Sequence, residues 1–347
     1  MRYFILIISI FLGLEIEAQN INYSNSEWQN FTTHIEKSTI IGLGEVSHGY
    51  ENINNTKSIF LDFLIKKQDF KNVIFESSFV ECIISFLSND SFENRLNSFI
   101  YPFWNTSSVK KVIKPISNNE KIENIPRILG CDIQEDCRFL KMTEYLNKEN
   151  LIIDNRNKLL QCDSILSQYI GSKHRKKEAL NSNEFSILKL NYNSIIQELL
   201  SRKNITALRK MLLLQCFQNR LWLCEYLTIS NITKRMKFRD SLMAVNVIWL
   251  SDEIIKNEKI IIWAASLHIA KKKNRDTKSE WMGEFLTTKF RNDYFTISIQ
   301  KGTSPTSKFL ENDFKIKYQS DNEKFNALIY LTTLEKIKST EWITKCD

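Results

Sequence analysis

Apolar positions along the chain follow two spacings, which predict strands in some segments and helices in others. Short continuous apolar runs predict buried strands. They lie at residues 39–43, 72–75, 127–131, 259–264, 294–299 and 327–331. Apolar side chains that recur every three or four positions predict helices at residues 24–37, 52–68 and 239–257. Strands separated by helices favour βα units and therefore a mainly parallel sheet.

The middle of the chain has a different pattern from its two ends. Residues 136–235 contain one glycine and no proline, and the segment 211–227 is apolar on nearly every side. This composition is typical of packed helices rather than of strands and turns. We therefore predict an α/β fold with a mainly parallel central sheet flanked by helices. Residues 19–135 and 236–347 would form this core, and residues 136–235 a large all-helical insertion.

The N-terminal residues resemble a secretory signal peptide. Arg2 precedes an apolar run at residues 3–14, and Ala18 offers a cleavage point, so residues 1–18 are the predicted leader. The run is too short to span a bilayer, which needs about 20 apolar residues, and no later stretch is long and apolar enough. We expect an exported protein, periplasmic or secreted. The alternative is a buried apolar N-terminal segment in a cytoplasmic protein.

The chain of 347 residues is mildly basic, with 48 Lys and Arg against 40 Asp and Glu and a net charge of +8. Its densest basic runs, at residues 173–177 and 271–275, have no interleaved aromatic residues and no accompanying nucleic-acid-binding motif. We expect solvated helix faces or ends there, and no nucleic-acid partner. Attraction to an acidic partner or a membrane surface is the alternative.

Cysteine and glycine usage narrows the choice of site. The seven cysteines are an odd number and include no C-x-x-C pair, so neither a zinc ribbon nor a thioredoxin-type site is indicated. Most are expected to be buried free thiols, although Cys131 and Cys137 are close enough in sequence for a small disulfide loop.

Three of only eight glycines, Gly42, Gly44 and Gly49, cluster at the end of the first predicted strand, where we expect them to let the backbone turn sharply.

Polar or ionisable residues follow four of the predicted strands where each apolar run ends. Glu45 and His48 follow the first strand, Glu76 the second, Asp132 the third and His268 the fourth. Ligand sites in open α/β sheets lie beyond the carboxyl ends of the strands. If these strands are parallel neighbours, the five side chains converge on one crevice. This convergence is the strongest indication of a site in the sequence.

His48 is the candidate general base, because an imidazole takes and returns a proton near neutral pH. Glu45 can fix its tautomer and stabilise the imidazolium, provided that the turn enters a helix and both side chains face the same way. Glu76 is a carboxylate at a strand end, and His268 is a second acid or base, an electrophile or a ligand. The structural alternatives are a loop histidine bonded to the backbone, a first-turn helix acid at Glu45, and a helix cap at Asp132.

Water is the candidate nucleophile. The sequence has no G-x-S-x-G elbow, and Ser47 is adjacent to His48, a position from which the two side chains rarely meet. Neither H-E-x-x-H nor a histidine pair at helical spacing occurs, so we expect no cofactor, although Glu45 and His48 leave a divalent metal ion open. The glycine-rich loop also lacks the third glycine of G-x-G-x-x-G and a Walker lysine, which argues against a phosphate-cradling loop.

Several segments resemble the erythromycin esterase family. Residues 42–49 (GLGEVSHG) are similar to the family's G-E-x-[ST]-H-G loop, and Lys57 follows in the next helix, where members have arginine or lysine. Residues 73–76 (VIFE) are similar to its second strand with its glutamate. Residues 239–246 are similar to its R-D-x-x-M-A-x-N helix, and residues 263–268 to its W-A-x-x-x-H strand end. Order and spacing agree over most of the mature chain.

The resemblance implies an α/β core with helical additions and a deep cleft. It implies hydrolysis of an ester or lactone, in characterised members the macrolide ring, and thus a link to antibiotic resistance. His48 would activate the water, and Glu45 and Glu76 would orient and polarise the water and the histidine. The residues that would bind substrate or stabilise the oxyanion are Lys57, Arg239 and His268.

One pair of positions departs from the family pattern. Members commonly have W-A-H-N-x-H, whereas this chain has Ala265 and Ser266 in place of the histidine and the asparagine. Asp132, at the same sheet edge, is added to the substrate-binding candidates. The expected partner is a small-molecule ester or lactone, and the sequence does not indicate an oligomeric state. Two alternatives stay open: a metal-dependent hydrolase of related fold, and a non-catalytic ligand-binding member.

Overall fold

The computed structural model describes most of the chain after the predicted leader. The described residues are 23–117, 125–136, 139–170, 179–272, 280–302, 315–319, 324–331 and 334–337. Outside them lie the predicted leader at residues 1–18, the basic run at 173–177, residues 273–275 of the second basic run, Cys137 and Cys346.

The chain divides into two compact units, Met1–Glu36 and Lys37–Asp347. Helix α1 (Ser26–Ile35) lies in the first unit, where it confirms the helix predicted at residues 24–37. The side chain of Asn25 caps this helix by accepting a hydrogen bond from the backbone N–H of Trp28. The other described elements, and every candidate site residue, lie in the second unit.

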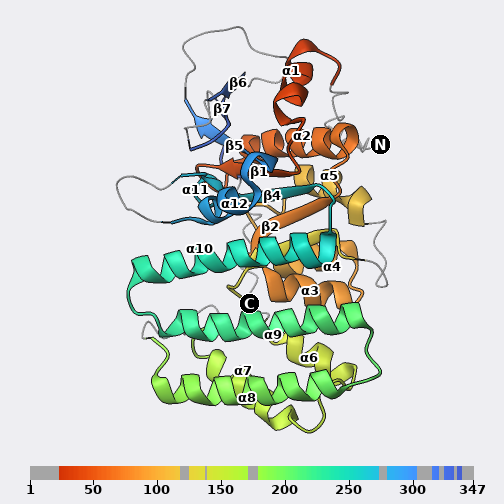
Figure 1. Cartoon of the computed structure of the whole chain (residues 1–347), viewed down its shortest axis with the longest axis vertical. Helices are drawn as coiled ribbons and strands as arrows, with labels where there is room; N and C mark the ends of the chain where they lie inside the picture. The colour runs from red at the N-terminus through yellow and green to blue at the C-terminus, as the bar shows by residue number, and fades with distance from the viewer. Residues whose placement is uncertain are drawn as a thin grey trace, which may run out of the picture. The chain divides into compact units, whose positions relative to one another are not determined.

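Seven described strands of the second unit form one sheet (Figure 1). They are β1 (Ile40–Glu45), β2 (Asn72–Ser78), β3 (Ile128–Asp132), β4 (Ile260–Ala265), β5 (Tyr294–Lys301), β6 (Lys315–Tyr318) and β7 (Ala327–Leu331). Their order across the sheet is β3-β2-β4-β1-β5-β7-β6, and among these strands β6 alone is antiparallel to its neighbour. The four strands that carry candidate residues are therefore consecutive parallel neighbours, as their convergence requires.

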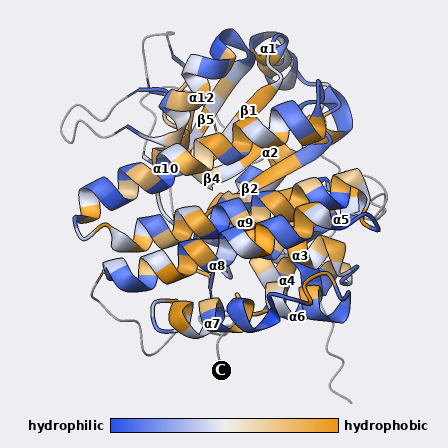
Figure 2. Ribbon diagram, turned by 60° about the horizontal axis from the view of Figure 1, so that its bottom comes forward, coloured by the Kyte–Doolittle hydropathy of each residue, from blue (hydrophilic) through white to orange (hydrophobic). Residues whose placement is uncertain are grey.

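Helices flank this sheet and build a further layer beyond it, which confirms the α/β fold with a helical insertion. Those interspersed with the strands are α2 (Glu51–Gln68), α3 (Phe79–Leu87), α4 (Phe92–Phe99), α5 (Ser107–Ser117), α11 (Ser266–Ile269), α12 (Met282–Phe290) and the short η2 (Arg291–Asp293). Those of the middle region are α6 (Lys141–Lys148), α7 (Arg156–Leu166), α8 (Ser182–Ser201) and α9 (Ala207–Thr228). Figure 2 shows largely hydrophobic central strands, whereas α8 and α10 carry residues of both kinds, as expected of helices with one buried side.

Helix α10 (Ile232–Trp249) begins earlier than the predicted helix at 239–257 and continues into the π-helix η1 (Leu250–Ile255). Its start is fixed by Asn231, whose side chain accepts a hydrogen bond from the backbone N–H of Lys234. The first turns are rich in basic residues, so apolar spacing does not reveal them. The helix therefore crosses the boundary predicted at residue 235 and links the helical layer to the strands.

A buried ion-pair cluster joins the helical layer to the sheet. Arg220 on α9 donates from Nε and Nη2 to the carboxylate of Glu135, just after β3, with both distances 2.9 Å. It also donates from Nη1 to Asp163 on α7 at 3.1 Å. Arg220 is fully buried. Loss of one partner would leave an uncompensated charge out of water, so the cluster holds these segments in one arrangement.

The glycine cluster does not form the sharp turn that its sequence suggests. Gly42 and Gly44 lie inside strand β1, and of the three glycines Gly49 alone has a left-handed backbone, with φ of 80°. A Cβ at Gly44 would approach Ser266 Cα and Ile269 Cδ1 to 2.7 Å. The missing side chain therefore lets α11 pack directly against β1.

Five cysteines of the described residues, Cys82, Cys131, Cys162, Cys216 and Cys224, are buried free thiols, as expected for most of them. Cys131 is thus a free thiol rather than half of a small disulfide loop. Among the helices of the described ranges, none combines the length and the apolar character needed to cross a membrane.

We predict that Gly44→Ala destabilises the protein by about 1–3 kcal/mol, because the added methyl group overlaps α11 in a packed core. Urea unfolding of the variant and the wild type measures this difference. The control is Val46→Ala, two residues away, where the side chain is 50% exposed and the expected change is small. Equal loss of stability in the two variants would contradict the packing argument.

Candidate active site

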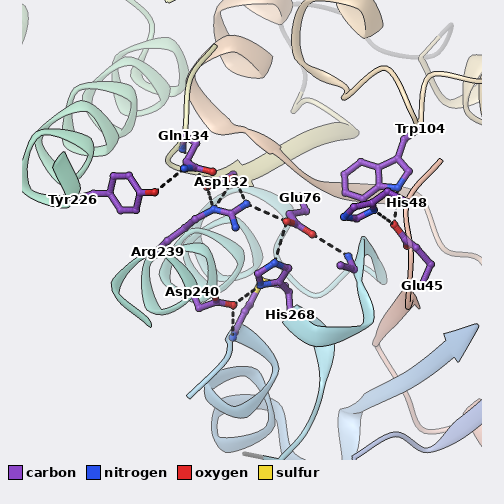
Figure 3. Close-up of polar contacts among 12 residues, drawn as sticks. Glu45, His48, Glu76, Trp104, Asp132, Gln134, Tyr226, Arg239, Asp240 and His268 are labelled. Atoms are coloured by element: carbon purple, nitrogen blue, oxygen red, sulfur yellow. Dashed lines mark hydrogen bonds and ion pairs between the residues drawn. The ribbon is translucent and has the colours of Figure 1, made fainter. Parts of the chain in front are cut away.

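The carboxyl ends of β1 to β4 bring the candidate residues to one edge of the sheet (Figure 3). Glu45 ends β1 and lies in register with Ala265 at the end of β4, while Asp132 ends β3 opposite Ser78 of β2. The register of β2 shifts where it carries Glu76, and such a bulge re-aims a side chain. We distinguish a first polar group of Glu45, His48, Lys57 and Trp104 from a second of Glu76, Asp132, Arg239, Asp240 and His268.

Glu45 and His48 are in direct contact in the first polar group. The imidazole Nδ1 lies 2.9 Å from Glu45 Oε1. The contact forms without the expected helical turn, because residues 46–49 are bends and α2 begins at Glu51. A carboxylate accepts hydrogen bonds, so Nδ1 carries the proton and Nε2 carries the lone pair that can receive one. The His48 side chain is 40% exposed, whereas that of Glu45 is 1% exposed.

Two further donors satisfy the buried Glu45 carboxylate. Trp104 Nε1 donates to Glu45 Oε1 at 2.7 Å, and Lys57 Nζ donates to Glu45 Oε2. The ammonium of Lys57 also lies 4.1 Å from the ring centroid of Trp263. Burial lowers the pKa of Lys57 to about 8, although Glu45 opposes the shift. Lys57 is fully buried, so the structure places it behind Glu45 instead of toward a substrate.

His268 lies between two carboxylates in the second polar group. Its Nε2 is 3.1 Å from Glu76 Oε1, and its Nδ1 is 2.6 Å from Asp240 Oδ1. Asp240 also accepts a hydrogen bond from the backbone N–H of Met282, and Glu76 accepts one from that of Ala265. Both ring nitrogens of His268 are therefore engaged, in contrast to those of His48.

The two carboxylates keep the His268 imidazole protonated. Burial alone would lower the pKa of His268, but the charges of Glu76 and Asp240, and hydrogen bonds to them, raise it to about 10. Burial likewise would raise the pKa of Glu76, but His268 and Arg239 lower it well below its usual range. At neutral pH His268 is an imidazolium, which cannot serve as a general base.

Arg239 connects Glu76 to Asp132. Its Nη2 donates to Glu76 Oε1 at 3.0 Å, and its Nε donates to both carboxylate oxygens of Asp132 at 3.0 Å. Asp132 is fully buried and also accepts a hydrogen bond from the backbone N–H of Gln134, but it caps no helix, because residues 133–136 are not helical. These contacts tie Arg239 to both carboxylates, and neither Arg239 nor Asp132 is part of the cavity lining described below.

A cavity of about 510 Å³ opens at this edge of the sheet. Its lining includes Glu45, Val46, His48, Ser266, Leu267 and His268. Four candidate residues are absent from the lining: Lys57, Glu76, Asp132 and Arg239. The structure thus brings Glu45 and one histidine of each polar group to a shared cavity, and it leaves the other four candidates outside the lining.

Three residues of the site are not evident from the sequence: Phe103, Trp104 and Asp240. Phe103 stacks on the His48 ring with centroids 4.5 Å apart, and Trp104 approaches the same ring edge-on at 5.5 Å. Both lie between α4 and α5, where a run of aromatic residues is the available signal. Asp240 follows Arg239 in sequence, but spacing alone does not show that it reaches His268.

The family model described as erythromycin esterase matches residues 65–318. The chain belongs to the erythromycin esterase family. This confirms the resemblance seen in the sequence and makes the chain a member of a hydrolase family. The matched range contains the whole second polar group and begins after the loop that carries Glu45 and His48.

Individual relatives agree with membership of the erythromycin esterase family. "Putative hydrolase YbfO" of Bacillus subtilis (strain 168) is 23% identical over an alignment of length 308, which covers 80% of this chain and 68% of that protein. The crystal structure of a mutant of erythromycin esterase EreC in its open conformation has a TM-score of 0.61 at 16% identity, with 93% of this chain and 83% of that chain covered. A succinoglycan biosynthesis protein of known structure has a TM-score of 0.64 at 15% identity, with 91% and 93% covered. The two structures share the fold of this chain.

Small side chains occupy the positions at which this chain departs from the erythromycin esterase pattern. Ala265 donates its backbone N–H to Glu76 Oε2 at 2.9 Å. Ser266 Oγ lies 2.6 Å from Ser298 Oγ, so the two hydroxyl groups satisfy each other. Both Ala265 and Ser266 line the cavity, which therefore has a methyl group and a hydroxyl group where the family pattern has an imidazole and an amide.

We predict that His268→Gln flattens the dependence of stability on pH between pH 6.5 and 8. The ordinary pKa of histidine is 6.5, whereas the pKa of His268 in the folded protein is about 10, so its stabilisation is complete below pH 6.5 and is lost as the pH rises toward 10. The wild-type free energy of unfolding should fall more steeply than that of the variant, by up to about 1.4 kcal/mol per pH unit. Urea unfolding at stepped pH measures both slopes.

The pH range of this experiment ends at pH 8, because above pH 8 the titration of Lys57 raises the stability with pH while that of His268 lowers it. The pKa of Lys57 is about 8 in the folded protein and 10.5 ordinarily. Between these values the unfolded chain binds more protons than the folded protein, so the free energy of unfolding rises with pH. His34→Gln, which removes an exposed histidine on α1, is the matched control and should keep the wild-type slope. Identical slopes for His268→Gln and the wild type would show that the Glu76 and Asp240 contacts do not hold the proton.

Proposed function

We propose that this chain hydrolyses an ester or lactone bond of a small molecule, with His48 as the general base and water as the nucleophile. The observation that carries the proposal is the 2.9 Å contact between Glu45 Oε1 and His48 Nδ1 in the lining of the cavity. This contact orients the imidazole and leaves Nε2 to receive a proton. Membership of a hydrolase family supports hydrolysis, and the likeness to EreC favours a carboxylic ester or macrolactone.

In the proposed reaction, a water molecule gives its proton to His48 Nε2 while its oxygen bonds to the carbonyl carbon. The carbonyl oxygen takes the negative charge of the tetrahedral intermediate. Collapse of this intermediate breaks the bond to the leaving oxygen, which takes the proton back from His48. The products are a carboxylic acid and an alcohol, or one hydroxy acid from a lactone. Glu45 remains ionised and stabilises the imidazolium in between.

His268 would contribute through its charge. It lines the cavity as an imidazolium, but Glu76 and Asp240 hold both of its nitrogens. It would therefore act on the developing oxyanion through its positive charge, which the two adjacent carboxylates offset, instead of by donating a proton. Glu76, which contacts His268, is held by Arg239, and Arg239 is in turn held by Asp132. Glu45, which contacts His48, is held by Lys57 and Trp104. The positions of both histidines therefore depend on buried partners.

We predict that His48→Ala lowers kcat on ester or lactone substrates by about 10²- to 10⁴-fold, the usual contribution of a general base. A panel of simple esters and lactones, assayed with and without a chelator, measures this effect. His48 is exposed on a loop, so the variant should fold as the wild type does. The matched control is His34→Ala, which should retain full activity.

Two results would contradict parts of this proposal. Unchanged turnover in His48→Ala would remove the base assignment. Loss of activity with chelator, restored by one metal ion, would favour the metal-dependent alternative. Within the described ranges, no group of three or more His, Cys, Asp and Glu side chains is arranged to hold such an ion.

We predict that Trp104→Phe lowers kcat about tenfold and changes KM little, because it removes a hydrogen bond to the Glu45 carboxylate while keeping an aromatic ring. Trp104 would then be a positioning residue for the base. Steady-state kinetics separates the two constants, and Trp249→Phe, a tryptophan on α10 that does not contact Glu45 or His48, is the control. A rise in KM at constant kcat would instead indicate direct contact with the substrate.

A further inference from the structure

We propose that the Ser266 hydroxyl group donates a hydrogen bond to the carbonyl oxygen of the scissile ester, and that Ser298 and Gln300 orient this hydroxyl group. The inference rests on the proposed function, because it names the donor that stabilises the tetrahedral intermediate of that reaction. Ser266 lines the cavity together with His48 and is the first residue of α11. It would be a catalytic residue, and Ser298 and Gln300 would be positioning residues.

The cationic residues of the two polar groups leave the carbonyl oxygen without a hydrogen-bond donor in direct contact. Both ring nitrogens of His268 are held by carboxylates, so their protons are already used. Lys57 and Arg239 are bound to carboxylates too, and neither is part of the cavity lining. A donor that touches the oxyanion stabilises it strongly, because the hydrogen bond strengthens as the charge develops. A neutral hydroxyl group in the lining can fill this role.

Hydrogen bonds among three side chains determine how the Ser266 hydroxyl group is used. Gln300 Nε2 donates to Ser298 Oγ at 3.3 Å, and Ser298 Oγ lies 2.6 Å from Ser266 Oγ. An amide NH2 group donates and does not accept, so the Ser298 proton is not shared with Gln300 Nε2. Within the described part of the chain, Ser266 Oγ is the acceptor in reach of that proton, so Ser298 donates and Ser266 accepts. This one bond uses the Ser298 proton and leaves the Ser266 proton for a ligand.

The strand register places Ser298 beside Ser266. Ser298 of β5 lies in register with Gly44 of β1, and Gly44 has no side chain to separate the strand from α11. A Cβ at Gly44 would approach Ser266 Cα to 2.7 Å, so Ser266 occupies the space next to this glycine. Ser298 and Gln300 are two residues apart on β5 and therefore point to the same face of the sheet. The sheet thus orients the hydroxyl group from one side, and the remaining proton points away from Ser298.

Low exposure strengthens this donor. Ser266 is 4% exposed although it lines the cavity, and Ser298 is fully buried. Little water competes for the hydroxyl proton, and a hydrogen bond is stronger where the local dielectric constant is low. Ser266 stands at the position of the asparagine in the family pattern, so the departure from that pattern keeps a hydrogen-bond donor in the cavity.

Ser266→Ala should lower kcat about 10²-fold on esters that the wild type cleaves and change KM little, because the lost bond forms fully only in the transition state. The matched control is Ser186→Ala, which removes a hydroxyl group that donates to the backbone of α8 and should keep full activity. Steady-state kinetics measures both constants, and circular dichroism checks the fold. Unchanged kcat in Ser266→Ala would overturn the inference.

Replacement of the carbonyl oxygen of the substrate by sulfur tests the contact itself. Sulfur is a weak hydrogen-bond acceptor, so a thionoester gains little from the Ser266 proton. We expect the wild type to prefer the oxygen ester over the matching thionoester more strongly than Ser266→Ala does, by roughly tenfold in the ratio of the two kcat/KM values. A structural role of Ser266 would lower both rates and leave this ratio unchanged, which would contradict the contact.

Gln300→Glu tests the direction of the hydrogen bonds. A carboxylate only accepts, so Ser298 would donate to it and Ser266 would donate to Ser298, which removes the proton proposed to reach the substrate. We expect kcat to fall roughly tenfold, and we expect little further fall when Gln300→Glu is added to Ser266→Ala. Equal effects with and without the Ser266 hydroxyl group would show that the added charge alone lowers kcat, and would overturn the role of Gln300.

The design separates failure of this inference from failure of the proposed function. Hydrolysis that depends on His48 but is unaffected by Ser266→Ala would overturn the donor and leave the hydrolase assignment standing. If the wild type cleaves none of the esters, calorimetry with phenyl methylphosphonate, whose oxygens resemble those of the tetrahedral intermediate, decides the donor alone. Weaker binding to Ser266→Ala than to Ser186→Ala would support the donor, and equal or absent binding to both would overturn it.

Discussion

The burial of the Glu45 carboxylate is the constraint on which this site depends. An ionised carboxylate removed from water costs several kcal/mol unless it is paired, and Glu45 is 1% exposed. Its three partners come from three different segments: Lys57 from α2, Trp104 from the connection between α4 and α5, and His48 from the loop after β1. Through this one carboxylate, the loop that carries His48, the proposed base, is connected to α2 and to the segment between α4 and α5.

The two histidines that line the cavity differ in the number of carboxylates that they contact. His48 contacts one carboxylate through Nδ1 and keeps Nε2 for chemistry. His268 is buried between Glu76 and Asp240, which engage both nitrogens and hold the ring in its charged form. The second carboxylate thus holds one imidazole in its charged form, while the other can still accept a proton, as the proposed base must do.

Much of the fold follows from local sequence patterns, whereas side-chain direction does not. Apolar runs locate the parallel strands, and strand ends locate Glu45, His48, Glu76 and His268, because the carboxyl ends of parallel neighbours share one edge. Apolar spacing cannot show that Lys57 folds back behind Glu45, since that choice depends on contacts across the sheet. The same holds for the other charged candidates outside the cavity lining and for Trp104, whose segment has no regular spacing.

The Arg220 cluster has a consequence for how the molecule loses its structure. Its guanidinium takes partners from the segment after β3 and from α7, so neither the helical layer nor the sheet edge satisfies it alone. If the helices detached, the Arg220 guanidinium, which is fully buried in the intact molecule, would be exposed to water or would lose some of its partners. The helical layer and the strands that position the site should therefore melt in one cooperative transition, so that partial opening of the insertion is disfavoured while the site is intact.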